Sequence, residues 1–206
     1  VQTALAEVSN ITLGDIDISS AALSAKITKD GGTEILEKGF CYSMNTEMPT
    51  IDNTLAVDPS EGMSINATLT GLEEGKAYYV RAYATNKNGT AYSNAVTFTT
   101  VQHYKPAVEG LAEIEVNDDN ATMEARLTDN GGMSITECGF CWDISSAEPD
   151  ITRHKKVIAT LKDGVFQAQL TGLAYNTSYH VRAYAVNGKG VGYSAYVIIK
   201  TRSSAK

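Results

Sequence analysis

The chain has 206 residues, 43% of them hydrophobic and 20% charged, a balance that excludes low-complexity disorder and is typical of a folded protein. Its formal net charge of −7 argues against nucleic acid as a partner, because binding to phosphates requires a basic surface. No apolar run is long enough for a membrane-spanning helix, so no transmembrane segment is expected.

The charge is unevenly shared between the two halves of the chain. Residues 1–103 carry 6 Lys and Arg against 12 Asp and Glu, whereas residues 104–206 carry 11 against 12. The acidic first half could repel anions or attract cations. The simpler interpretation is a solvated acidic surface that aids solubility.

Short strands separated by turns are predicted along the first half. Apolar and polar residues alternate from Ala21 to Ile27, and a turn is expected at 30–32. A strand over 35–43 and a polar, proline-containing stretch at 45–49 come next. Strands over 65–69 and 78–84, a hairpin turn at 86–89 and a strand over 92–98 complete the first half. The pattern has no helical period and favours an all-β fold.

The second half repeats the first. GGTEILEKGFCY at 31–42 matches GGMSITECGFCW at 131–142 in seven of twelve positions, and residues 68–93 match residues 169–194 in fourteen of twenty-six. The first pair of blocks is offset by 100 residues and the second by 101. A repeat of this length is long enough for a complete domain with its own core. We therefore predict two tandem immunoglobulin-like β-sandwiches, over residues 1–101 and 106–202. The short linker, closed by Pro106, predicts restricted hinge motion.

One repeated segment resembles the penultimate strand of fibronectin type III domains. It contains Leu72, Gly75, Tyr78, Arg81 and Asn86 in the first copy and Leu173, Asn176, Tyr179, Arg182 and Asn187 in the second. The resemblance implies that each tyrosine packs in the core while its hydroxyl bonds a nearby backbone group, the "tyrosine corner". Gly75 suits a left-handed turn position, and asparagine tolerates the same conformation in the second copy.

The Gly-Gly…Gly-Phe-Cys-(Tyr/Trp) block resembles variant fibronectin-like repeats carried in tandem by secreted and outer-surface proteins of Gram-negative gut bacteria. The resemblance implies a non-enzymatic extracellular or cell-surface module, a spacer or cell-adhesion protein, on a bacterial outer membrane as a lipoprotein or secreted, with its signal peptide removed. The alternative is a carbohydrate-binding component of a surface polysaccharide-uptake system. The partner would be an extracellular protein or glycan, with flanking domains possible.

No catalytic, metal or cofactor site is predicted, and the chain is not expected to be an enzyme. Cys138 and Cys141 have a redox or metal spacing, but an extended strand would point them to opposite faces, and zinc would need a second pair. We therefore expect the cysteines, with Cys41, to be buried or incidental thiols. Glycines 188, 190 and 192 are expected to form a hairpin turn rather than a phosphate loop. The histidines, His103, His154 and His180, are interpreted as surface residues.

One strand of each copy offers a candidate binding surface on the face opposite its apolar side chains. The residues are Tyr79, Arg81 and Tyr83 in the first copy and His180, Arg182 and Tyr184 in the second. Facing outward, they could stack against a sugar or a neighbouring chain. They could equally form a cross-strand ladder that stiffens the sheet. On the preceding strand we expect the aromatic residues Phe40, Tyr42, Phe140 and Trp142 inside, although the pattern alone leaves its core face open.

Overall fold

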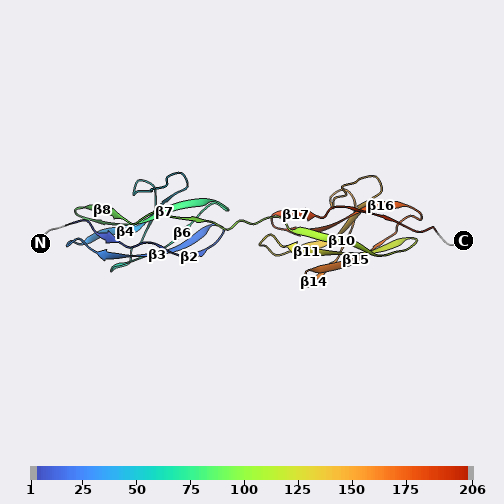
Figure 1. The fold of residues 1–206 in the computed structure, drawn as a ribbon, viewed down its shortest axis with the longest axis horizontal. Helices are drawn as coiled ribbons and strands as arrows, with labels where there is room; N and C mark the ends of the chain where they lie inside the picture. Colours follow the sequence, from blue (N-terminus) through green and yellow to red (C-terminus); the bar gives the residue numbers. More distant parts are fainter. Residues whose placement is uncertain (1–3, 204–206) are drawn as a thin grey trace. The chain divides into compact units, whose positions relative to one another are not determined.

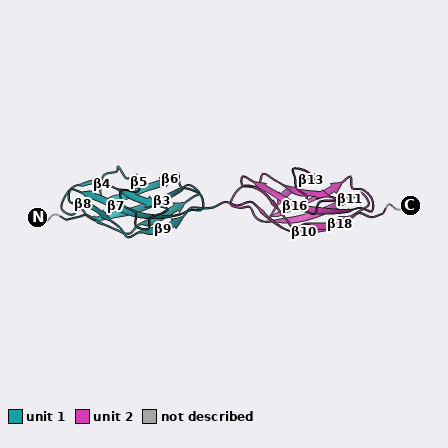
Figure 2. Ribbon diagram, turned by 90° about the horizontal axis from the view of Figure 1, so that it is seen from above, with its two compact units in different colours: residues 1–102 teal, residues 103–206 magenta. Residues whose placement is uncertain are grey.

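The computed structural model describes residues 4–203, which form strands, turns and loops (Figure 1). The chain divides into two compact units, residues Val1–Gln102 (unit 1) and His103–Lys206 (unit 2), coloured separately in Figure 2. Among the described residues no helix is long and apolar enough to cross a bilayer.

Unit 1 packs two antiparallel sheets face to face. The four-stranded sheet contains β1 (Glu7–Val8), β2 (Thr12–Ile16), β3 (Ser20–Lys29) and β6 (Ser64–Thr70). The five-stranded sheet contains β5 (Thr54–Val57), β4 (Ile35–Ser43), β7 (Ala77–Asn86), β8 (Gly89–Tyr92) and β9 (Val96–Thr99). β5 lies at one edge, because it hydrogen-bonds to β4 alone.

Unit 2 repeats this arrangement. Its four-stranded sheet contains β10 (Ala107–Val116), β11 (Asn120–Asp129), β15 (Val165–Thr171) and β14 (Thr160–Lys162). Its five-stranded sheet contains β13 (Lys155–Ile158), β12 (Glu137–Asp143), β16 (Ser178–Asn187), β17 (Gly190–Tyr193) and β18 (Val197–Lys200). The predicted fold class, two tandem immunoglobulin-like β-sandwiches, is confirmed by these strand pairings.

Each unit has its own hydrophobic core between its two sheets. In unit 1 the largest fully buried aliphatic and aromatic side chains include Phe40, Ile65 and Leu69, and in unit 2 Phe140, Phe166 and Leu170 occupy the matching places. The alternation of β3 explains this, because successive side chains of a strand point to opposite faces and every second one reaches the core.

The aromatic residues of β4 and β12 point inward, as predicted. Phe40 and Phe140 are fully buried, Tyr42 packs against the unit 1 core and Trp142 belongs to the unit 2 core. This settles which face of each strand is core. It also places Cys41 and its equivalent on the outer face of the five-stranded sheet, where they are nevertheless buried.

The tyrosine corner is present in both units. The hydroxyl of Tyr78 accepts a hydrogen bond from the backbone N–H of Glu73, and the hydroxyl of Tyr179 accepts one from Ala174, both at 2.8 Å. Gly75 and Asn176 adopt the expected left-handed conformation, with φ of 66° and 51°. The leucines and asparagines of the repeated signature are buried as well: Leu72, Leu173, Asn86 and Asn187.

Asn86 and Asn187 hold the first residues of their units in place. The Asn86 side chain donates to the carbonyls of Ala4 and Asp30, both at 2.8 Å. In unit 2, Asn187 donates to the carbonyls of Tyr104 and Asn130 at 2.7 and 2.8 Å. These buried amides satisfy carbonyls that have no strand partner, which gives both asparagines a structural role.

Candidate functional site

The structure corrects the expected outward aromatic surface at two of its six positions. Tyr83 and Tyr184 are fully buried, at 0% exposure. Their hydroxyls donate to the carboxylates of Glu37 and Glu137 at 2.7 and 2.8 Å. Burial, together with the hydrogen bond to the carboxylate, raises the pKa of both tyrosines. Neither ring is available to stack against a ligand.

Beside these rings the segment after β4 folds back over the outer face of the sheet, onto Cys41 and onto Tyr92, the cross-strand neighbour of Tyr83. The Cys41 thiol donates to the carbonyl of Pro49 at 3.3 Å, and the backbone N–H of Ile51 donates to the Tyr92 hydroxyl at 3.2 Å. Unit 2 repeats both contacts, from Cys141 to Pro149 at 3.3 Å and from Ile151 to Tyr193 at 3.1 Å. The strand pattern predicted a core face and a solvent-exposed face, but in each unit this loop lies over the face that was expected to be exposed.

The two arginines of the predicted surface support this cover. The Arg81 guanidinium lies 4.4 Å from the centre of the Tyr92 ring, and its Nε donates to the carbonyl of Ser93 at 2.9 Å. Arg182 makes the same contacts with Tyr193 and Ser194, at 4.4 and 3.0 Å. This is the cross-strand ladder considered as the alternative to a ligand surface.

Tyr79 and His180, the remaining two positions, are partly exposed. The His180 ring packs edge-on against Tyr196, with ring centres 5.1 Å apart, and Tyr196 is 46% exposed. The Nδ1 atom of His180 is buried and has no hydrogen-bond partner among residues 4–203. A binding role at these positions stays a prediction.

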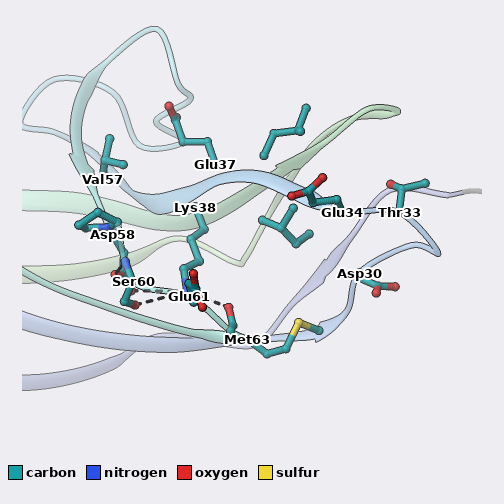
Figure 3. Close-up of a pocket in the computed structure, with 14 residues that line it drawn as sticks. Asp30, Thr33, Glu34, Glu37, Lys38, Val57, Asp58, Ser60, Glu61 and Met63 are labelled. Carbon is teal, nitrogen blue, oxygen red and sulfur yellow. Dashed lines mark hydrogen bonds and ion pairs between the residues drawn. The ribbon is translucent and has the colours of Figure 1, made fainter.

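Unit 1 contains a concave groove. It has a volume of about 600 Å³ and lies between the first half of β4 and the segment 57–63 (Figure 3). Its lining combines the acidic residues Asp30, Glu34, Glu37, Asp58 and Glu61 with Leu36, Val57 and Met63. The last three are 65%, 47% and 42% exposed, so the groove offers apolar contact surface within an acidic surround.

A buried lysine forms the floor of this groove. Figure 3 shows Lys38 extending from β4 toward the segment that carries Ser60 and Glu61. Its ammonium donates to the carbonyls of Gly62 and Ser64 at 2.8 and 2.5 Å and lies 3.9 Å from the carboxylate of Asp58. Both side chains are almost fully buried, so each charge depends on the partners that the loop provides.

Asp58 in turn organises the loop. Its carboxylate accepts backbone N–H groups from Ser60 at 2.9 Å and Asn66 at 2.7 Å. Burial alone raises the pKa of Asp58, but the hydrogen bonds from Ser60 and Asn66, with the charge of Lys38, lower it by more, so the net pKa lies below its ordinary value. The carboxylate is therefore held ionised.

Unit 2 replaces this ion pair with uncharged residues. Cys138 stands where unit 1 has Lys38, and Ala159 stands where unit 1 has Asp58, because Asp58 and Ala159 donate their backbone N–H to the carbonyls of Lys38 and Cys138 respectively. The groove was not predicted from the sequence. The available signal was the Lys38-to-Cys138 difference inside an otherwise well-matched block.

The three thiols are buried, with Cys138 in the unit 2 core and Cys141 on the other face of the same strand. Burial raises the pKa of Cys41 to about 11 and of Cys141 to about 12, and also raises that of Cys138. The thiolate is the reactive form. Their placement on opposite faces matches the expectation from the strand.

We expect these thiols to resist a disulfide reagent of the Ellman type at neutral pH while the protein is folded. All three should react once guanidinium unfolds the chain, because unfolding restores access and an ordinary pKa. The released chromophore counts the reacted thiols. Fast reaction of any thiol in the native protein would contradict the burial described above.

Two further positions considered in the sequence, His154 and Gly190, lie in turns of the backbone. His154 accepts the backbone N–H of Asp150 on Nδ1 at 3.0 Å, which closes the turn before β13. Gly190 begins β17 in a hairpin with β16, as expected for a turn. Within residues 4–203 no cluster of three or more His, Cys, Asp or Glu side chains is arranged to hold a metal ion.

A scan against protein-family models gives no match to the chain, and a search of curated proteins gives none. Among solved structures, the chain is similar to the crystal structure of chicken CNTN1 FN1–FN3 domains, with 18% sequence identity and a TM-score of 0.41. The match covers 95% of this chain and 66% of that one, so the chain spans about two thirds of that structure's length. A similarity at this level carries no functional argument, and the fold assignment rests on the strand pairings themselves.

Proposed function

We propose that the chain is a non-enzymatic extracellular module, a two-domain spacer or adhesion fragment. The observation that supports this proposal is the presence of two complete sandwich cores within one chain, each closed by its own tyrosine corner. A unit with its own core keeps its shape without help from its neighbour, which suits a module that separates or presents other domains. We place the module outside the cell or on a bacterial surface.

Pulling the chain between two handles in a force experiment tests this modular role. Two separate unfolding events are expected, each releasing roughly 340 Å of chain at about 3.4 Å per residue. A single event that releases both units together would contradict autonomous modules. Cleavage by a protease added to intact cells of the source organism tests the surface location, since an internal protein would be protected.

Carbohydrate binding is the second candidate, and the exposed Tyr196 beside His180 is the observation that favours it. A glycan array should then give a signal that Tyr196→Ala removes. Tyr175→Ala is the matched control, because Tyr175 is another aromatic residue of unit 2 and is 57% exposed. No signal across a broad array would count against this candidate.

A further inference from the structure

The five-stranded sheet of each unit ends in an edge strand, and the residues around the two edge strands carry charge of opposite sign. β5 hydrogen-bonds to β4 alone and β13 to β12 alone, so each leaves one backbone edge unpaired. Residues 50–63, which include β5, contain three acidic residues and no Lys or Arg. The equivalent residues 150–164, which include β13, contain four Lys or Arg against two acidic residues, Asp150 and Asp163. Equivalent edges of the two repeats therefore differ in the sign of their charge.

β5 also lacks the charged side chains that usually prevent edge strands from pairing with other proteins. Its sequence, Thr-Leu-Ala-Val, has no lysine or proline, and Leu55 and Val57 are 37% and 47% exposed. Soluble proteins commonly place lysine on such an edge to block association. In unit 2 the equivalent strand begins with Lys155-Lys156, and only Ile158, at 59% exposure, offers a large exposed apolar side chain.

Beside the edge strand, unit 2 has a lysine paired with a glutamate, whereas unit 1 has the glutamate without the lysine. Lys156 lies opposite Cys141 in the sheet, and its ammonium donates to Glu137 at 2.7 Å. This bond, with the one from Tyr184, lowers the pKa of Glu137. Leu55 occupies the equivalent position in unit 1. Among the described residues, the Glu37 carboxylate has a hydrogen bond from Tyr83 but no cationic partner.

We propose that the acidic edge, β5 with its adjoining groove, binds the basic edge, β13 with Arg153, of a second copy of this chain. Val57 and the groove residues Leu36 and Met63 would contact Ile158. Lys155 would lie against Glu61, and Arg153, which also pairs with Asp150 of its own unit at 2.6 Å, would lie against Glu34. Strand addition supplies backbone hydrogen bonds, and the opposite charges select this pairing over β5 with β5. Each chain carries both edges, so the contact is heterologous. This goes beyond the proposed function, because a spacer does not require self-association.

Sedimentation velocity of the full chain over a wide range of concentration tests the proposal. The average mass should rise above that of the monomer as concentration increases, and added salt should reverse the rise because it screens exposed charges. A chain that stays monomeric at every concentration overturns the proposal. So does a monomer that binds an oligolysine peptide in the groove without associating with itself.

Charge reversal supplies the decisive comparison. Lys155→Glu and Glu61→Lys should each abolish the association, and the two together in one chain should restore it. Lys200→Glu is the matched control: Lys200 is also exposed, but it lies on β18, away from the β13 edge, and should leave the association unchanged. Equal loss from Lys200→Glu, or no loss from Lys155→Glu, overturns the proposal. All three residues are exposed, so circular dichroism should show that each of the four variants folds.

Discussion

Replacing Asp58 with alanine is expected to lower the free energy of unfolding of unit 1 by about 3–5 kcal/mol, the range seen when one member of a buried ion pair is removed. The substitution removes the acceptor of the Ser60 and Asn66 N–H groups and leaves the Lys38 ammonium buried without its counterion. Denaturant unfolding followed by circular dichroism measures the loss.

The repeat offers an internal control for this experiment. The double variant Lys38→Cys with Asp58→Ala introduces the pair that unit 2 uses, so it should lose less stability than Asp58→Ala alone. The single tryptophan, Trp142, lies in the unit 2 core, so its fluorescence reports that unit separately and should not change. Equal losses in the single and double variants would show that the charge of Lys38 is not what makes the single substitution costly.

Acid should lower the stability that Asp58 contributes to unit 1. Because the pKa of Asp58 is lower in the folded protein than in the unfolded chain, its contribution is complete above the unfolded value of about 3.9 and disappears as the pH falls through the lower, folded value. The stability of Asp58→Asn should therefore depend less on pH in this acidic window. A parallel decline of both proteins would contradict the role of Asp58.

The second large effect is expected from Tyr184→Ala, which should destabilise unit 2 by about 3–5 kcal/mol, the usual range for truncating a buried aromatic residue. The ring is fully buried and its hydroxyl donates to Glu137 at 2.8 Å. The unfolding transition seen by Trp142 fluorescence should shift to lower denaturant. Tyr83→Ala should have an equivalent effect on unit 1.

Two further substitutions separate the effect of losing the buried ring from the effect of losing its hydrogen bond. Tyr184→Phe keeps the ring and removes the hydrogen bond, so about 1–3 kcal/mol should be lost. Tyr196→Ala removes an aromatic ring that is 46% exposed in the same unit and should change stability little. If Tyr184→Ala unfolded at the wild-type denaturant concentration, the outer face would have to be open, and the stacking surface would return as an interpretation.

The fold could be predicted because its signals are local and occur twice. Alternation along β3 and β6 identifies strands with one buried face, and the Gly75-to-Asn176 replacement identifies a left-handed turn, since both residues tolerate that conformation. The tyrosine corner was implied by the resemblance of the same segment to fibronectin type III domains. Each of these features depends on residues close together in the chain.

The burial of Tyr83 and Tyr184 could not be predicted in the same way. Period-two alternation distinguishes the two faces of a strand but does not say whether a loop covers the polar one. The cover depends on contacts distant in sequence, such as Arg81 with Pro49 at 3.4 Å. The groove beside Lys38 is equally non-local, because its walls come from β4 and from the segment 57–63.

The sequence by itself determined that this protein is a duplicated β-sandwich with an acidic first repeat, because hydrophobic period, turn chemistry and charge are properties of the residues in order. Tertiary structure alone decided which side chains stay accessible. Two aromatic rings of the outer faces, Tyr83 and Tyr184, are buried, and strand pairing left β5 and β13 as edges. Accessibility depends on what lies against a side chain in space, and that is set only when distant segments pack together.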